Sequence, residues 1–257
     1  MEMVYKEIIN FIMISGKRIA KRAGKIEDIG IKKRYLTEED IAIERGMKEI
    51  IKKHYPNHEF YAEEENETFS EAENVWIADP ISSTKTFIQG LPHYGIVISY
   101  VKNKIVQFAV VYDPSADELF TAYRGKGAFL NGEKISVSKP SGNLKVVFNL
   151  SSQWKDKKSA EDMLEKLQKF ELFRNTNSHA VNLCYVACGR YDGVICFCKD
   201  SFPYFAGSLI IQESGGIFTN KDGNSVIHHK DRVFIGGNIE AYKKLLEVLQ
   251  CVRFSNL

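Results

Sequence analysis

The sequence predicts a layered protein of mixed α and β structure, with an α+β first half and an α/β second half. In the first half, two amphipathic helical segments precede apolar segments of strand length that are joined by short turns. In the second half, short apolar strands alternate with helices, which is typical of α/β units. Lys139–Asn143 is rich in turn-forming residues, so we expect domains at 1–140 and 141–257.

The first half is predicted to begin with two helices, at residues 2–22 and 37–55. The first helix has apolar residues at helical spacing and a basic end with Arg18 and Arg22, which we expect to be a solvated last turn. Thr37 is a suitable N-cap for the second helix. Strands are predicted at residues 60–62, 75–78, 94–101, 105–112 and 118–123, with tight turns at 102–104 and 131–132.

The second half is predicted to alternate between strands and helices up to the last segment. Pro203 is a good first residue for one helix, and Gly215 and Gly216 end it. Strands are predicted at residues 145–150, 172–174, 193–198, 217–219 and 232–235. Helices are predicted at residues 159–170, 179–188, 203–213 and 240–249.

The stretch from Val75 to Thr84 is the one around which the chain is organised. Val75–Ala78 is typical of a buried strand, and Pro80 is expected to end it because proline cannot donate to a sheet. Asp79 would then lie at the strand tip, where an acid can hold a cation or ligand. The hydroxyl groups and backbone N–H groups of residues 82–84 suit an anion.

Glu63 provides a second carboxylate at the end of a strand, since it directly follows the predicted strand 60–62. Two strand-end carboxylates can share a hard cation. Asp40 lies in the first turn of a predicted helix, and spacing alone indicates only an acid that complements the helix dipole.

Three segments together resemble a known family. Asp79–Thr84 is similar to the Asp-Pro-Ile-Asp-Gly-Thr signature of the inositol monophosphatase family. Ala62–Glu64 resembles its Gly-Glu-Glu element, and Asn177–Gly216 resembles its second signature region. The resemblance covers nearly the whole chain in the right order. It implies that family's layered fold, a Mg²⁺-dependent phosphomonoesterase acting on inositol or sugar phosphates, and a homodimer.

The resemblance also implies roles for individual residues. Glu63, Asp79 and the Ile81 carbonyl match metal ligands of the family. Thr84 matches the residue that binds the nucleophilic water, and Asp40 matches the acid that orients this threonine. The N–H of Ser83 would face the phosphate, together with Thr84, although the Ser83 Cβ crowds a turn where the family has glycine.

Two metal-binding positions of the family pattern are altered. Ser82 and Pro203 stand where the family has aspartates, and neither replaces a carboxylate around Mg²⁺. We therefore expect one weak Mg²⁺ site rather than two or three, and hydrolysis slower by roughly 10²–10⁴-fold. Asp200 or Lys85 could compensate for the missing acid or cation.

The expected substrate pocket is altered too. Cys196 stands where the family has a glutamate that contacts inositol hydroxyls, and His179 stands where it has a small residue. Alternatively, His179 is a polar group satisfied at a helix start. Four thiols could form a structural zinc site, and they are Cys184, Cys188, Cys196 and Cys198. Their spacing is not Cys-x-x-Cys and both elements are typical of core, so we expect buried cysteines instead.

Composition limits the function classes. The net charge of +2 gives no support for bulk nucleic-acid binding, and no apolar segment approaches transmembrane length. Five cysteines without a secretion signal predict reduced thiols in the cytoplasm. Three hypotheses remain: a weakened phosphatase of a small phosphorylated molecule; a pseudoenzyme that binds such a ligand or a protein partner; and a bacterial regulatory relative that binds transcription machinery through basic residues such as Lys17, Arg18, Lys21 and Arg22.

Overall fold

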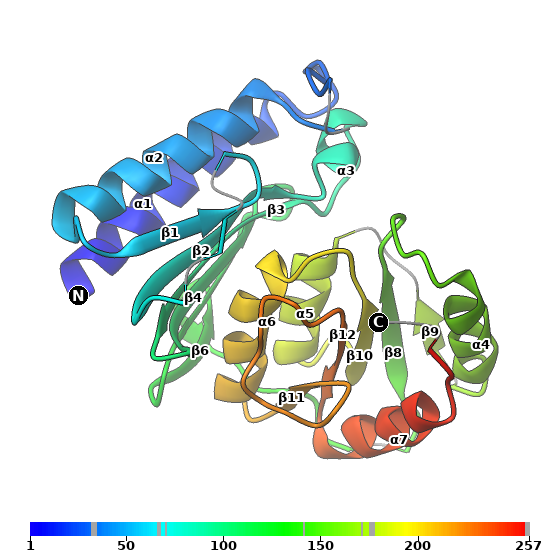
Figure 1. The fold of residues 1–257 in the computed structure, drawn as a ribbon. Coiled ribbons are helices and arrows are strands. Elements are labelled where there is room, and N and C mark those ends of the chain that lie inside the picture. Colours follow the sequence, from blue (N-terminus) through cyan, green and yellow to red (C-terminus); the bar gives the residue numbers. More distant parts are fainter. Residues whose placement is uncertain are drawn as a thin grey trace.

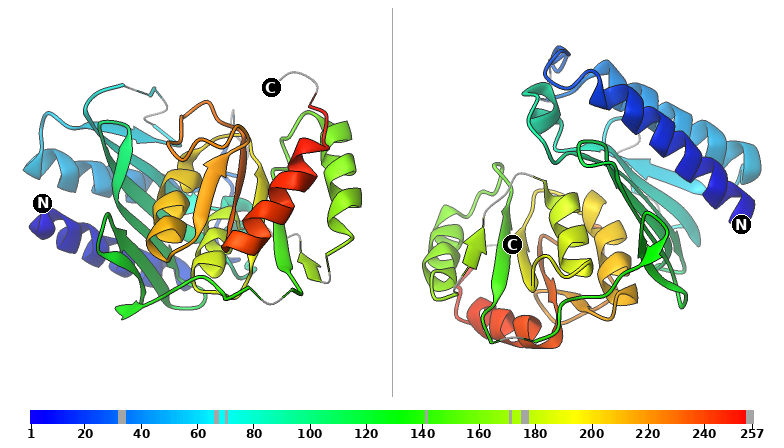
Figure 2. Two further views of the ribbon diagram at one scale, coloured as in Figure 1. Left: turned by 90° about the horizontal axis from the view of Figure 1, so that it is seen from below. Right: turned by 180° about the vertical axis from the view of Figure 1, so that it is seen from behind.

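Two β-sheets and three layers of helices alternate through the molecule (Figure 1). This structure is a computed structural model, and it describes residues 1–31, 35–65, 68–69, 71–140, 142–170, 172–174 (backbone only) and 178–254. Two helices cover the outer face of the first sheet, two lie between the sheets, and two cover the outer face of the second (Figure 2). The layered α/β fold predicted from the sequence is confirmed.

The first sheet has seven strands in the order of the sequence. They are β1 (Glu59–Ala62), β2 (Asn74–Ser82), β3 (Gly95–Lys102), β4 (Ile105–Asp113), β5 (Glu118–Tyr123), β6 (Gly127–Leu130) and β7 (Glu133–Lys134). β1 and β2 are parallel, and every other neighbouring pair is antiparallel. The five predicted strands are confirmed, but β6 and β7 were not predicted. The tight turn that joins them was predicted, and it lies at Asn131 and Gly132, where φ is 50° and 88°.

One predicted strand end is wrong. β2 does not stop before Pro80 but continues to Ser82. β1 pairs with β2 only as far as Ala78, so beyond that point this side of β2 has no ladder for Pro80 to interrupt. On the other side, the register with β3 shifts between Asp79 and Ser82. Proline is tolerated at such bulges and sheet edges.

α1 (Glu2–Ala20) and α2 (Glu38–His54) pack on the outer face of the first sheet. Thr37 caps α2 as predicted, in a capping box with Asp40. The basic end of α1 is exposed to solvent as predicted, and two of its residues also form ion pairs. Arg18 and Arg22 form ion pairs of 2.7 and 2.6 Å with Glu39, whose side chain is only 5% exposed.

The second sheet has five strands in the order β11-β12-β10-β8-β9. Its elements are β8 (Lys145–Leu150), β9 (Leu172–Arg174), β10 (Gly193–Phe197), β11 (Ile217–Asn220) and β12 (Val233–Gly237). α4 (Lys157–Leu167) and α7 (Ile239–Gln250) cover its outer face. α5 (His179–Ala187) and α6 (Phe202–Glu213) lie between the sheets. The alternation predicted for this half is confirmed.

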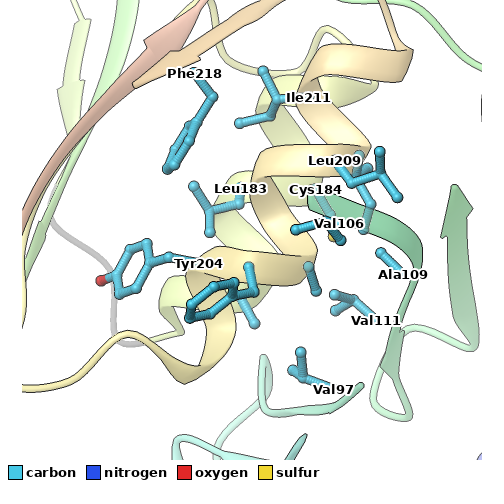
Figure 3. Packing of buried hydrophobic residues seen from close by; sticks show 14 of the residues in the cluster. Val97, Val106, Ala109, Val111, Leu183, Cys184, Tyr204, Leu209, Ile211 and Phe218 are labelled. Atoms are coloured by element: carbon cyan, nitrogen blue, oxygen red, sulfur yellow. The ribbon is translucent and has the colours of Figure 1, made fainter. Parts of the chain in front are cut away.

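The buried cluster between the sheets joins the two halves of the chain. Figure 3 shows Val97 and Val111 of the first sheet on the same side of α6 as Leu209, and Leu183 of α5 on the other side, near Phe218. Residues of β10 and β11 complete the cluster from the other side. The sheets fall on either side of residue 140. The division into domains 1–140 and 141–257 stays a prediction.

The described residues contain neither a membrane-spanning helix nor a disulfide bond. Within the described residues, no helix is both long and apolar enough to cross a bilayer. All five cysteines are free thiols.

Candidate functional site

A cleft of about 690 Å³ lies where the two halves meet. Its first wall carries the predicted residues Glu63, Asp79 and the turn 81–84. Its second wall includes His179 and Pro203. The cleft is also lined by the segment after β8, which was not singled out in the sequence because it carries no acidic strand end. The structure thus brings together most of the predicted site residues.

The parallel pairing of β1 with β2 positions both acids. Ala62 and Ala78 are partners in the ladder, so Glu63 and Asp79 follow them at the same sheet edge. Asp79 is opposite Val97, and its side chain therefore shares the sheet face that packs toward α5 and α6. Asp79 is 3% exposed. Register and side-chain alternation thus direct this carboxylate to the boundary between the halves.

A residue that the sequence did not indicate holds the loop after β1. The Glu44 carboxylate is fully buried and accepts hydrogen bonds of 2.8 Å from the backbone N–H groups of Glu64 and Glu65. Because these residues follow Glu63 directly, Glu44 fixes the backbone that presents the Glu63 carboxylate. Glu44 lies one helical turn after Asp40, and this spacing was the signal available in the sequence.

Thr84 and Asp40 form a buried hydrogen-bonded pair. The Thr84 Oγ1 atom lies 3.0 Å from Asp40 Oδ1 and 2.8 Å from the Ile81 carbonyl oxygen. Burial raises the pKa of Asp40 to about 7, against hydrogen bonds from Thr37 and Thr84 that lower it, and the charge of Glu63 raises it further. Asp40 therefore completes the helix cap and also contacts the predicted water-binding threonine.

The turn between β2 and α3 (Thr84–Ile88) is conformationally strained. Ser83 is in the left-handed region, with φ 76° and ψ 49°, a conformation that favours glycine. Its side chain does not cap α3. Ser82 is the last residue of β2 and is 5% exposed. A buried hydroxyl thus occupies the position where the sequence comparison expected a carboxylate.

The second wall is electrically neutral at its buried surface. Tyr204 is fully buried, and its hydroxyl lies 2.6 Å from His179 Nδ1. Burial lowers the pKa of His179 to about 4, which keeps the imidazole uncharged at neutral pH, and His179 also bonds to the Leu150 backbone. Pro203, in the first turn of α6, contributes only its ring.

The two residues considered as compensations both line the cleft. The Asp200 carboxylate accepts a hydrogen bond of 3.4 Å from the Phe202 N–H at the start of α6. The Lys85 side chain is exposed, and its Nζ lies 5.6 Å from the centre of the Tyr35 ring. Both compensations stay predictions.

The structure supports the buried-core interpretation for Cys184, Cys196 and Cys198. Cys196 does not line the cleft but is fully buried, with the Asn149 amide 3.5 Å from its sulfur. No group of three metal-ligating His, Cys, Asp or Glu side chains occurs in the part of the chain that the structure describes. Burial raises the pKa values of three of the proposed zinc ligands, which keeps them neutral core residues: Cys184, Cys196 and Cys198.

The oxygen donors on the first wall fit one hard cation. They are the carboxylates of Glu63 and Asp79 and the carbonyl of Ile81, all lining one region of the cleft. Oxygen ligands of this kind suit Mg²⁺ or Ca²⁺ rather than a soft metal. Across the cleft, Pro203 offers no donor, so the residues that would complete a second site are not matched.

The chain is similar to known proteins over nearly its whole length. The model of the inositol monophosphatase family matches residues 2–253. The protein named Nus factor SuhB from Pseudomonas aeruginosa is 30% identical over 250 residues, which are 92% of each chain. The solved IMPase of Thermotoga maritima is 28% identical, covers 97% of both chains and has a TM-score of 0.84. The extragenic suppressor protein suhB of Bartonella henselae is 26% identical, with coverages of 96% and 98% and a TM-score of 0.86.

Proposed function

Because the chain belongs to the inositol monophosphatase family, we propose that it binds a small phosphorylated molecule with one Mg²⁺ ion and hydrolyses it very slowly. The observation that carries this proposal is the hydrogen bond of 3.0 Å between Thr84 Oγ1 and Asp40 Oδ1. It supports a water-activating pair beside Glu63 and Asp79, facing a second wall that has Pro203 instead of an acid.

The first wall supplies the groups that binding and water activation need. Glu63, Asp79 and the Ile81 carbonyl would hold Mg²⁺, which supplies charge neutralisation of the phosphate when bound. Thr84 Oγ1 orients a water by accepting its hydrogen bond while donating its own proton to Asp40. When the water loses a proton to Thr84 Oγ1, the Thr84 proton passes to Asp40, which with a pKa near 7 is partly ionised at neutral pH and can accept it.

The second wall explains why hydrolysis is slow. Phosphate ester cleavage leaves negative charge on the departing oxygen, which a second cation or an acid normally neutralises. Ser82 and Pro203 supply no carboxylate for such a cation. The neutral pair of His179 and Tyr204 is already bonded within the wall. We expect a rate lower by roughly 10²–10⁴-fold than that of a complete site.

The test combines Mg²⁺ titration by calorimetry with phosphate release from inositol 1-phosphate and other phosphomonoesters. The variant carries Ser82→Asp with Pro203→Asp, and its matched control carries Ser82→Asn with Pro203→Asn. We expect one weak Mg²⁺ site and slow release from the wild type, and a second site with faster release from the aspartate variant only. Wild-type turnover of about 1 s⁻¹ or more would contradict the proposed impairment and turn attention to Asp200 and Lys85.

A regulatory function is the second candidate, because the relative from Pseudomonas aeruginosa is named Nus factor SuhB. In this chain Lys17 and Lys21 are exposed, whereas Arg18 and Arg22 are engaged by Glu39. All four basic side chains are at least partly exposed, but Glu39 offsets part of the charge of the two arginines. A pull-down with RNA polymerase and with nucleic acid at increasing salt tests this candidate, and retention at low salt alone would indicate only charge attraction. The homodimer and the cytoplasmic location stay predictions.

A further inference from the structure

The second wall of the cleft is a mixed polar and apolar surface, and its apolar residues come from three elements. It is formed by the end of β8 and the segment after it, by one face of α4, and by the start of α6. Its apolar residues are Leu150, Trp154, Ala160, Leu164, Pro203 and Tyr204. We call the surface formed by these six residues the apolar wall.

The polar atoms within the apolar wall are already bonded to protein. The Tyr204 hydroxyl and His179 Nδ1 lie 2.6 Å apart, and His179 also bonds to the Leu150 backbone. The indole N–H of Trp154 donates to the Asp156 carbonyl at 2.8 Å and to Ser159 Oγ at 3.1 Å. A ligand placed against this wall therefore meets ring faces and methyl groups rather than available donors and acceptors.

The apolar wall should favour a phosphate ester whose alcohol part is apolar over one whose alcohol part is a polyol. A polyol buried there would lose hydrogen bonds to water without replacement, which is unfavourable, whereas a flat apolar group would gain from leaving water. Polar side chains surround these apolar residues in the cleft: Ser151, Ser152, Gln153, Lys157, Glu161, Lys199 and Asp200. Those of Ser152, Gln153, Lys157, Glu161 and Lys199 are exposed and stay hydrated. The volume of about 690 Å³ accommodates a bicyclic ring with its phosphate.

We propose that the cleft selects phosphomonoesters of aromatic alcohols over those of polyols, with the ring on the apolar wall. The phosphate would lie at the turn of Ser83 and Thr84 on the first wall. This inference rests on the proposed function, because it assigns the chemical class of the ligand for that same site. It makes Leu164 and Trp154 specificity-determining residues.

The test measures binding rather than turnover. Calorimetry with Mg²⁺ present compares 1-naphthyl phosphate, inositol 1-phosphate and inorganic phosphate as ligands of the full chain. We expect 1-naphthyl phosphate to bind at least about tenfold more tightly than inositol 1-phosphate. Leu164→Asn places a polar amide on the apolar wall and should reduce that ratio to about three or less, since the ring loses contact and the polyol gains a partner.

The matched control is Leu246→Asn. Leu246 is a partly buried leucine of α7 that packs on the same hydrophobic cluster as Leu164 but does not line the cleft. The control should leave the ratio unchanged, and equal unfolding temperatures of the two variants would exclude a difference in folding.

Three outcomes would overturn the inference. If inositol 1-phosphate binds as tightly as 1-naphthyl phosphate, the inference fails while the proposed binding function stands. If Leu164→Asn weakens both esters equally, or Leu246→Asn changes the ratio as much, the apolar wall is not the ring site. If neither ester nor inorganic phosphate binds in the presence of Mg²⁺, the proposed function fails and the inference fails with it.

Discussion

The two walls of the cleft differ in buried charge, backbone strain and side-chain packing. The first wall carries the left-handed Ser83 and is supported from behind by two buried acids of α2, Asp40 and Glu44. The second wall is packed like a protein interior, with the Tyr204 ring stacked on Phe234 at 4.6 Å. Buried acids and strained backbone lower stability, whereas a packed aromatic ring raises it.

This difference indicates where function has been kept. Groups that cost stability persist when the surrounding structure holds them for a purpose, and on the first wall they converge on Thr84 and Glu63. The buried part of the second wall contributes stability and shape, and its His179 and Tyr204 are uncharged. Truncation of a buried side chain should therefore cost more stability on the second wall than on the first.

The largest expected effect is a loss of stability when a buried side chain of the second wall is truncated. Tyr204→Ala removes a fully buried ring and should lower the free energy of unfolding by about 3–5 kcal/mol. Thr84→Ala, on the first wall, loses only a hydroxyl bonded to Asp40 and should cost about 1–2 kcal/mol. Urea unfolding of both variants measures the contrast. Equal losses would show that the two walls do not differ in this way.

The next effect is a pH dependence that belongs to the first wall. The pKa of Asp40 is about 7 in the folded protein, above its ordinary value of 3.8. Between these two pH values the unfolded chain has released this proton while the folded protein retains it. The contribution of Asp40 to stability is therefore full below pH 3.8 and falls as pH rises to 7, with a slope of up to about 1.4 kcal/mol per pH unit.

Asp40→Asn isolates this contribution because it imitates the protonated acid. The amide oxygen can accept from Thr37, and the amide N–H₂ can donate to Thr84 Oγ1, whose own proton goes to the Ile81 carbonyl. The difference between the unfolding free energies of the two proteins, measured from pH 4 to pH 8, should favour the variant increasingly up to pH 7. A difference that is constant with pH would contradict the raised pKa.

Much of the fold could be predicted because the patterns were local. Alternating apolar residues, Thr37 as a cap, and Asn131-Gly132 as a turn each depend on neighbours in sequence. The strand end at Pro80 was mispredicted because the tolerance for proline depends on where β1 stops, which is a tertiary fact. β6 and β7 are short, at four and two residues, and their pairing with β5 defines them more than their composition does.

The candidate site was predictable only where residues carry distinctive chemistry. Glu63, Asp79 and Thr84 stood out because acids and hydroxyls follow buried strands. The apolar wall gave no such signal, since Leu164 and Trp154 look like ordinary core residues in sequence. Cys196 was misplaced because a position counted along a strand does not reveal which face turns inward, and this thiol turns into the core.

A smaller effect should follow from Glu44→Gln. Gln keeps one acceptor but sets an amide N–H₂ against one of the two N–H groups of Glu64 and Glu65. We expect a loss of about 1–3 kcal/mol in unfolding free energy and Mg²⁺ binding weakened by roughly 10–100-fold, because the loop that presents Glu63 loosens. Glu49→Gln, an exposed change on the same helix, is the control and should do neither. Normal Mg²⁺ affinity in Glu44→Gln would mean that Glu44 supports folding alone.

The smallest expected effect has the opposite sign, and it tests the strain on the first wall. Ser83→Gly relieves a φ of 76°, and it removes no cap hydrogen bond from the start of α3. Since glycine also gains freedom in the unfolded chain, the net stabilisation should be only about 0.5–1 kcal/mol. Ser152→Gly is the control: its φ is not positive, and the change should destabilise slightly. Thermal unfolding measures both. If Ser83→Gly is no more stable than Ser152→Gly, the left-handed turn carries no strain, and the contrast between the walls then rests on their buried acids.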